Sequence, residues 1–207
     1  MNKAEEKNIK NLLFDLGGVI MDLKRQNCVD ALVALGMTDA DQRLGLYVQK
    51  DPFLKLEEGK ISPEDFLNEL RGYMRPGVTD AQIVDAFNAF LVGIPVERLR
   101  KLVELRKEYR IYVLSNTNEI MWNSKIDSEF RKDGHDLDYY VDGCVTSFDA
   151  GVCKPDARIF RELENRFGLV PEETLFFDDS AANCEAAAKL GFHTVTVAPG
   201  TDFSQYI

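Results

Sequence analysis

The sequence predicts an α/β protein with a parallel five-stranded sheet and an inserted helical segment. Three observations lead to this fold class. Five short apolar runs are spaced along the chain, helical patterns separate the last four, and a long helical stretch separates the first two. The expected strands cover residues 12–16, 111–114, 143–147, 175–177 and 194–198. Strands that alternate with helices in this way are typical of right-handed βαβ units, and therefore of a Rossmann-like core.

The segment between the first two expected strands is far too long for a single crossover, and it carries helix signals instead of strand signals. Ser62 and Pro63 begin one helix, as an N-cap followed by proline at the first helical position. Thr79 begins another, and apolar residues at helical spacing end an earlier one at Gly36. A further helix over residues 95–107 leads into the second strand. We therefore predict a Rossmann-like core from residues 1–21 and 96–207, and a helical cap from residues 22–95.

Composition limits the classes of function. A chain of 207 residues with 45% hydrophobic content is long enough for one sizeable core with a small accessory domain. The net charge of −10 argues against a nucleic-acid partner, because binding to phosphate backbones requires clustered cations. No apolar run approaches ~20 residues, and residues 1–10 are charged and lack an apolar signal core. We expect a cytoplasmic protein with free thiols and no membrane contact, as a monomer or weak dimer.

Polar and charged residues stand where strands of the predicted sheet end. Asp15 follows the first strand and precedes a glycine turn, and Ser115 and Asn116 end the second. Asp178 and Asp179 follow the fourth strand. Because the carboxyl ends of parallel strands meet at one edge of the sheet, this edge is where open α/β sheets place their chemistry. A lysine, Lys154, lies in a loop immediately before Pro155 and a predicted helix.

These four patterns, in this order, resemble those of the haloacid dehalogenase-like (HAD) hydrolase superfamily, and the resemblance covers most of the chain. It implies a Mg²⁺-dependent phosphatase that hydrolyses a small phosphorylated metabolite through an aspartyl-phosphate. The implied catalytic residues are Asp15 as the nucleophile and Lys154. Substrate binding is assigned to Ser115, Asn116 and Lys154. The implied metal site comprises Asp15, the backbone carbonyl of Gly17, Asp179 as a direct ligand, and Asp178 as a ligand or a neighbouring acid.

Elementary chemistry agrees with these roles. Mg²⁺ prefers oxygen ligands, and a divalent cation relieves the repulsion between an ionised carboxylate and a dianionic phosphate ester. Lys154 would add a positive charge beside the transferring phosphoryl group. The hydroxyl group of Ser115 and nearby backbone N–H groups would bind the phosphate oxygens.

The sequence departs from the family pattern at Gly17. The phosphatases of the family carry a second aspartate two residues after the nucleophile, and its loss typically removes ~10²–10⁴-fold in rate. The F-D-L-G-G-V-I form is instead similar to bacterial sugar-phosphate phosphatases such as α-glucose-1-phosphatase. Asp22, a residue of the predicted cap or water would then supply the proton. Two other functions stay open, namely a catalytically weak phosphate-binding or regulatory protein and a dehalogenase.

Overall fold

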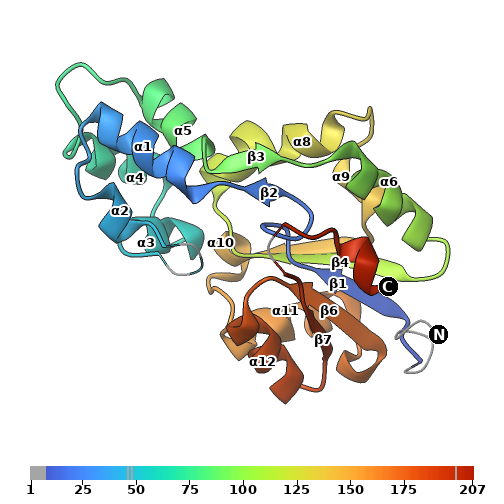
Figure 1. Cartoon of the computed structure of the whole chain (residues 1–207). Coiled ribbons are helices and arrows are strands. Elements are labelled where there is room, and N and C mark those ends of the chain that lie inside the picture. The colour runs from blue at the N-terminus through green and yellow to red at the C-terminus, as the bar shows by residue number, and fades with distance from the viewer. Residues whose placement is uncertain (1–7, 46, 48, 199) are drawn as a thin grey trace.

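The computed structural model describes residues 8–45, 47, 49–198 and 200–207. Five parallel strands form the central sheet in the order β5-β4-β1-β6-β7, which confirms the predicted fold class (Figure 1). The strands are β1 (Asn11–Phe14), β4 (Arg110–Ser115), β5 (Gly143–Thr146), β6 (Thr174–Asp178) and β7 (His193–Thr196). Successive strands run outward from β1 on one side and then on the other, so β1 lies at the point where the direction of winding reverses.

The first strand ends at Phe14, two residues before the predicted end. Asp15 still donates its N–H to the carbonyl oxygen of Phe177 at 2.8 Å. However, Leu16 donates its N–H to the Asp15 carboxylate at 2.7 Å, and the chain then turns through glycine residues. The N–H of Leu16 therefore bonds to the Asp15 side chain instead of to a neighbouring strand, and the regular hydrogen bonding of β1 ends here.

Alternate residues of the strands pack into two apolar layers. Leu12 and Phe14 belong to one cluster and Leu13 to the other, as expected for strands buried on both faces. Helices α6 (Val96–Leu105) and α9 (Leu137–Tyr140) cover the first face, and α11 (Ala157–Phe167) and α12 (Ala181–Lys189) cover the second (Figure 1). Short helical segments complete the core: α7 (Glu119–Met121), a π-helical turn (Trp122–Ile126), α8 (Asp127–Arg131), α10 (Ser147–Ala150) and 3₁₀ turns at Pro171–Glu173 and Phe203–Tyr206.

In the segment between β1 and α6, the described residues form five helices, which lie beyond the carboxyl edge of the sheet (Figure 1). They are α1 (Arg25–Leu35), α2 (Ala40–Arg43), α3 (Phe53–Glu57), α4 (Pro63–Arg71) and α5 (Asp80–Asn88). The predicted caps are present: Ser62 accepts from the N–H of Asp65, and Thr79 forms a capping box with Gln82. The division of the chain into a core and a cap at residues 22 and 95 stays a prediction.

Two short strands that the sequence did not indicate join this segment to the core. β2 (Asp22–Leu23) pairs antiparallel with β3 (Leu91–Gly93), so that the chain leaves and re-enters the core side by side. Arg98 of α6 donates to the Asp22 carboxylate at 2.7 Å and to the carbonyl oxygen of Ile20 at 3.1 Å. Strands of two and three residues are too short to produce a periodic pattern in the sequence.

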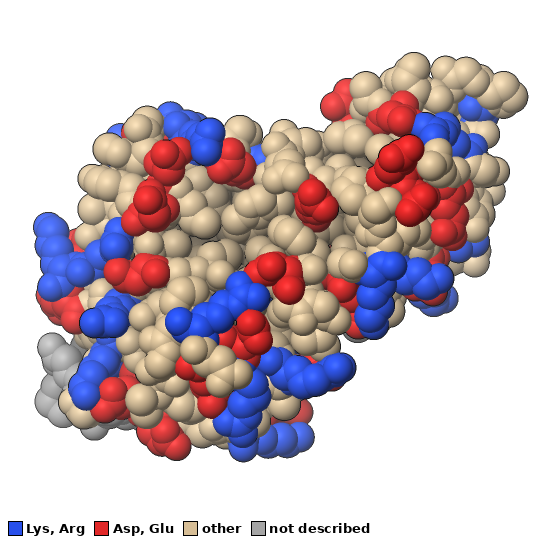
Figure 2. Space-filling view, turned by 180° about the vertical axis from the view of Figure 1, so that it is seen from behind, with Lys and Arg blue, Asp and Glu red and all other residues tan. Residues whose placement is uncertain are grey.

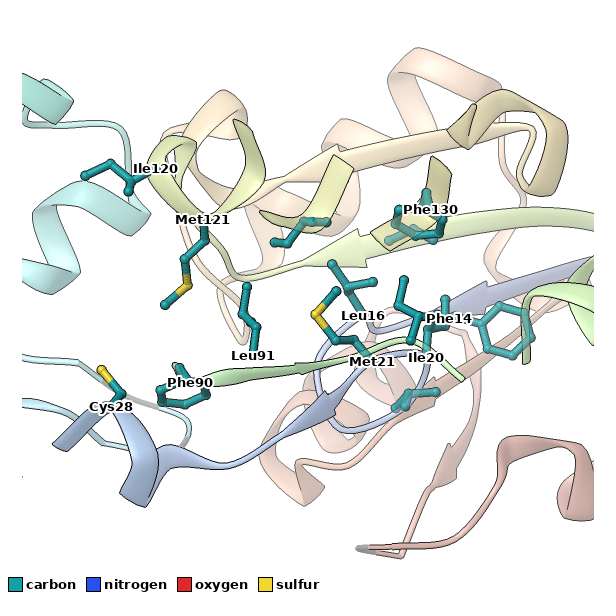
Figure 3. Close-up of a cluster of buried hydrophobic side chains, with 14 of the residues drawn as sticks. Phe14, Leu16, Ile20, Met21, Cys28, Phe90, Leu91, Ile120, Met121 and Phe130 are labelled. Carbon is teal, nitrogen blue, oxygen red and sulfur yellow. The ribbon is translucent and has the colours of Figure 1, made fainter. Parts of the chain in front are cut away.

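The apolar core continues from the sheet into the helical segment. Figure 3 shows Leu16, Met21, Leu91 and Met121 grouped around the exit from β1. Beyond them, the rings of Phe53, Phe66 and Phe87 contact one another with centroids 5.4–5.6 Å apart. This continuous packing sets the position of the helices against the sheet.

Charges are distributed over the surface instead of being concentrated. On the face that Figure 2 shows, Lys and Arg side chains alternate with Asp and Glu side chains. Many charged residues in the described part of the chain form short-range ion pairs, such as Arg166 with Glu162. In the part of the chain that the structure describes, no helix combines the length and the apolar character that crossing a bilayer requires.

Candidate active site

The register of the sheet brings the predicted site residues together. Phe14 of β1 lies opposite Val113 of β4 and Phe177 of β6. The next residues along these strands, Asp15 and Asp178, are therefore neighbours at the carboxyl edge, and β4 ends beside them at Ser115. The arrangement follows from the parallel pairing of three strands that are far apart in the sequence.

Lys154 joins the two aspartates. Its buried ammonium group lies 2.8 Å from an oxygen of Asp15 and 2.8 Å from an oxygen of Asp178. It also donates to the carbonyl oxygen of Leu114 at 2.9 Å. All three N–H donors of the ammonium group thus have acceptors, which holds the charge at one point above the strand ends.

The loop that carries Lys154 is held by Asn116. The Asn116 amide accepts from the backbone N–H of Lys154 at 2.8 Å and donates to its carbonyl oxygen at 3.0 Å. The side chain of Asn116, which the sequence assigned to substrate binding, therefore positions the lysine. Ser147 fixes the same turn, because its hydroxyl group accepts from the N–H of Thr117 and donates to its carbonyl.

Asp178 is fully enclosed and fully hydrogen-bonded. One oxygen accepts from the backbone N–H of Ser180 at 2.8 Å, and the other accepts from Lys154. The amide of Asn183 donates to both oxygens, at 3.0 and 3.1 Å. We did not identify Asn183 from the sequence, although it stands five residues after Asp178, on the first turns of α12, and faces back to the strand end. Asp178 therefore orients Lys154 in this structure.

Asp179 completes a cluster of three acids. Asp15, Asp178 and Asp179 each offer a carboxylate oxygen, and these oxygens lie within 4.8 Å of one another. Asp179 sits directly over Gly18, whose φ of 77° and close approach exclude a side chain, since a Cβ there would overlap the Asp179 carboxylate. The glycine turn thus brings the backbone next to the acidic cluster.

The excess negative charge of this cluster matches the charge of a divalent cation. Three carboxylates face one ammonium group, and Lys154 is the only cation among the described residues that line the pocket. Two negative charges are therefore unbalanced in a buried setting, and hard oxygen donors are the ligands that Mg²⁺ prefers. Asp15 and Asp179 could hold it, and Gly17, whose carbonyl group the sequence assigned to the same metal site, lines the same pocket.

Burial and the unequal numbers of negative and positive charges shift the pKa values of the residues in the cluster. Burial raises the pKa of Asp15 despite the nearby Lys154, and the neighbouring acids raise it further. Burial, together with the charge of Asp178, raises the pKa of Asp179 to about 6. The two aspartates that contact Lys154 raise the pKa of its ammonium group, so the lysine stays charged. A bound divalent cation would oppose the rise at both acids and keep Asp15 ionised.

A pocket opens over the cluster between the sheet edge and the helical segment. The sheet side contributes polar groups, among them Asp15, Ser115 and Lys154. The helical side is mainly apolar, and its polar side chains are Tyr47, Gln49 and Glu57. The apolar lining residues are Leu16, Met21, Leu23, Leu44, Phe53, Phe87, Phe90, Leu91, Met121 and Ile126.

The position that lacks an acid is covered by a leucine. A Cβ built on Gly17 would lie 2.8 Å from a terminal carbon of Leu23. Asp22, considered above as a substitute acid, does not line the pocket, and its carboxylate is paired with Arg98 at 2.7 Å. Its observed contact supports the attachment of the helical segment rather than proton donation.

Known proteins with similar sequences share this architecture. A family model described as haloacid dehalogenase-like hydrolase matches residues 9–191. A D-ribitol-5-phosphate phosphatase from Bacteroides thetaiotaomicron is 36% identical over 197 residues, which cover 95% of this chain and 96% of that protein.

Solved structures agree with the sequence matches. A HAD family enzyme from Bacteroides thetaiotaomicron, in complex with magnesium and inorganic phosphate, superposes with a TM-score of 0.91 at 36% identity, covering 95% of this chain and 98% of that one. A predicted HAD-like family hydrolase from Porphyromonas gingivalis gives a TM-score of 0.84 at 37% identity, with 94% of each chain covered. An L-2-haloacid dehalogenase from Xanthobacter autotrophicus, at 18% identity and a TM-score of 0.58, shares the fold alone. The chain belongs to the haloacid dehalogenase-like hydrolase family.

Proposed function

We propose that this protein is a Mg²⁺-dependent phosphatase that hydrolyses the phosphate monoester of a sugar or sugar alcohol through an aspartyl-phosphate on Asp15. The observation that carries the proposal is the position of Lys154 between Asp15 and Asp178, with Asp179 in the same cluster at the carboxyl edge of the sheet. The similarity to a D-ribitol-5-phosphate phosphatase over nearly the whole of both chains supports the class of substrate.

Asp15 acts as the nucleophile. One of its oxygens, Oδ1, accepts from Leu16 and contacts Lys154, so the carboxylate is held with Oδ2 as the oxygen available for attack. Attack forms a bond between this oxygen and phosphorus, the ester P–O bond breaks, and the alcohol leaves after taking up a proton. Water then attacks the phosphorus of the aspartyl-phosphate, and Asp15 and inorganic phosphate are released.

Lys154 and the backbone beyond β4 stabilise the phosphoryl group. The ammonium group stays charged and is fixed by three acceptors, so it meets developing negative charge without reorganising. Ser115 and the N–H of Asn116 lie at the end of β4 and bind phosphate oxygens. Asp15, Asp179 and the carbonyl of Gly17 would hold Mg²⁺, which neutralises charge between nucleophile and phosphate. Asp178 keeps Lys154 in place.

The test is a panel of phosphate monoesters offered to the purified protein with Mg²⁺ and with a chelator. We expect release of inorganic phosphate from sugar or sugar-alcohol phosphates with Mg²⁺ and none with the chelator. The variant Asp15→Asn, assayed beside the wild type, controls for contaminating phosphatases. Undiminished activity in chelator, or no activity on any monoester, would contradict the proposal.

We further propose that the protein works in the cytoplasm as a monomer or weak dimer. All four of its cysteines are free thiols, and Cys28 and Cys184 are buried. Free thiols persist in reducing compartments. We also propose that it has no nucleic-acid partner, because the net charge of −10 disfavours binding to phosphate backbones.

A further inference from the structure

Glu57 stands opposite the catalytic cluster in the same pocket. It is the last residue of α3, it lies on the helical side of the pocket, and it is half-buried. Asp15 and Lys154 line the pocket from the sheet side. A substrate whose phosphate occupies the sheet side would extend its alcohol part toward the helical side, where Glu57 is exposed to the cavity.

The Glu57 carboxyl group has neither a hydrogen-bond donor nor a cation within reach among residues 8–45, 47, 49–198 and 200–207. Its neighbour differs in this respect, because Glu58 forms an ion pair with Lys60 at 2.7 Å and does not line the pocket. A partly buried carboxyl group without a partner carries an unfavourable desolvation cost, which a ligand that bonds to it would remove.

The other polar groups on the helical side already have partners. The amide of Gln49 accepts from the N–H of Gly45 at 3.1 Å and donates to its carbonyl oxygen at 3.2 Å. The hydroxyl group of Tyr47 interacts with the Asp179 carboxylate. Among the described polar side chains on the helical side, Glu57 is therefore the one without a hydrogen-bond partner.

The protonation state of Glu57 suits a hydroxyl group. Burial, with a smaller effect from Glu58, raises the pKa of Glu57 to about 8. At neutral pH the carboxyl group is therefore mostly protonated, and it both donates and accepts a hydrogen bond. An alcohol does the same, and a neutral carboxyl group does not repel an anionic substrate.

The packing fixes Glu57 relative to the sheet. Phe53 and Leu56, on the same helix, are buried in the core. The chain after the helix passes so close to α10 that a Cβ at Gly59 would overlap the carbonyl oxygen of Phe148. α3 therefore rests on the core beside the loop that leads to Lys154, and the carboxyl group has a defined position over the pocket.

We propose that Glu57 is a specificity-determining residue that hydrogen-bonds a hydroxyl group on the alcohol part of the substrate, and so selects polyol and sugar phosphates over phosphates without hydroxyl groups. The assignment rests on the phosphatase function proposed above. In a mainly apolar wall, a single donor–acceptor pair discriminates strongly, since a substrate that lacks the hydroxyl leaves the partly buried carboxyl group unpaired.

The experiment compares two esters with primary alkoxide leaving groups of equal chain length, D-ribitol 5-phosphate and n-pentyl phosphate. In Glu57→Leu, the ratio of kcat/KM for the ribitol ester to kcat/KM for the pentyl ester should fall about 10- to 100-fold, chiefly through KM. Glu57→Gln, whose amide also donates and accepts, should retain the ratio within about 3-fold. The matched control Glu58→Gln, on the neighbouring residue outside the pocket, should leave the ratio at the wild-type value.

Inhibition by inorganic phosphate reports on the sheet side separately, because this ion has no alcohol part. Its inhibition constant should be the same in Glu57→Leu and the wild type. An unchanged ratio in an active Glu57→Leu enzyme would overturn the assignment of Glu57 and leave the phosphatase function standing, and so would an equal loss on both esters. Failure of the wild type to hydrolyse any monoester in Mg²⁺ would overturn both.

Discussion

The two sides of the pocket differ in how their polar groups are satisfied. On the sheet side, Asp15, Lys154 and Asp178 are linked by contacts of 2.8 Å and are tied to the backbone around them. On the helical side, the wall is mostly apolar and Glu57 has no partner among the residues with a described structure. Reacting groups must be held in a fixed geometry for catalysis. The side that binds the variable part of a substrate instead needs polar groups that are free to hydrogen-bond the substrate.

The two sides also differ in what holds them. The sheet side is fixed by the ladders from β1 to β4 and β6, which leave little freedom at the strand ends. The helical side depends on apolar packing and on the β2–β3 ribbon, through which the chain passes twice. Substitutions on the sheet side should therefore affect catalysis or folding strongly, and substitutions on the helical side should alter the preference between substrates.

The largest expected effect is on the sheet side. Asp15→Asn removes the nucleophile and should lower kcat by at least ~10³-fold with the thermal midpoint nearly unchanged, since shape is preserved. The matched control is Asp22→Asn, whose carboxylate is paired with Arg98 outside the pocket. It should keep kcat within a few-fold of the wild type. Residual activity of more than a few per cent in purified Asp15→Asn would exclude the covalent mechanism.

The second test removes the cation that joins the acids. Lys154→Met leaves Asp15 and Asp178 buried without a positive partner, which should cost ~3–5 kcal/mol of unfolding free energy. The loss should be greater at pH 8 than at pH 5, because burial raises the pKa of Asp15 and this acid is protonated at the lower pH. Lys10→Met breaks an exposed pair with Glu173 and should cost less than ~1 kcal/mol in urea unfolding. An equal loss of unfolding free energy in the two variants would show that the buried ion pairs contribute no more to stability than the exposed pair.

A third test concerns the metal and pH. The pKa of Asp179 in the folded protein is raised to about 6, so the folded state holds a proton that the unfolded chain releases near pH 4. This contribution to stability is complete below pH 4 and is lost as pH rises through 6. Mg²⁺ binds the ionised carboxylates, so its stabilising effect should grow with pH. We expect the rise in Tm on adding Mg²⁺ to be several degrees greater at pH 8 than at pH 5, and to shrink in Asp179→Asn. A rise that is independent of pH would argue against a metal at these acids.

A fourth test restores the missing acid. Gly17→Asp forces Leu23 aside and should cost about 1–3 kcal/mol of stability, much of which Leu23→Ala should recover in the double variant. A new acid near the leaving oxygen should help basic leaving groups most. The ratio of kcat/KM for phenyl phosphate to that for pentyl phosphate should therefore be at least ~10-fold smaller in the double variant than in the wild type. If the ratio is the same in both, another group already protonates the alcohol.

The smallest effect is a change of preference with pH on the helical side. Because the pKa of Glu57 is raised to about 8, the carboxyl group loses its donor proton above this pH, and the preference for the ribitol ester over the pentyl ester should fall a few-fold by pH 9. Glu58, which is paired with Lys60, and Cys153 interact electrostatically with Glu57. Burial raises the pKa of the Cys153 thiol to about 12, so the thiol stays protonated in this range. Burial also raises the pKa of Asp15 to about 8, but its titration affects both esters alike, so Glu57→Gln should show no such fall.

The sequence alone was sufficient to predict much of the sheet side. Asp15, Ser115 and Asp178 each end an apolar run, and the ends of parallel strands must meet at one edge of the sheet. Strand boundaries agreed within two residues because β-propensity and burial are local properties of short segments. Ser62 and Thr79 were identified as helix caps for the same reason: a cap bonds to residues only two or three positions away.

Only the tertiary structure decided the contacts between distant segments. It turned the amide of Asn116 toward Lys154, placed Asn183 on Asp178, and paired Asp22 with Arg98. It also paired β2 with β3 and brought Glu57 over the pocket. These contacts join residues that local pattern cannot relate, because strand register and the packing of helices against the sheet depend on the whole chain. The chemistry of the strand ends was therefore readable from the sequence, whereas the surroundings that direct it come from long-range packing.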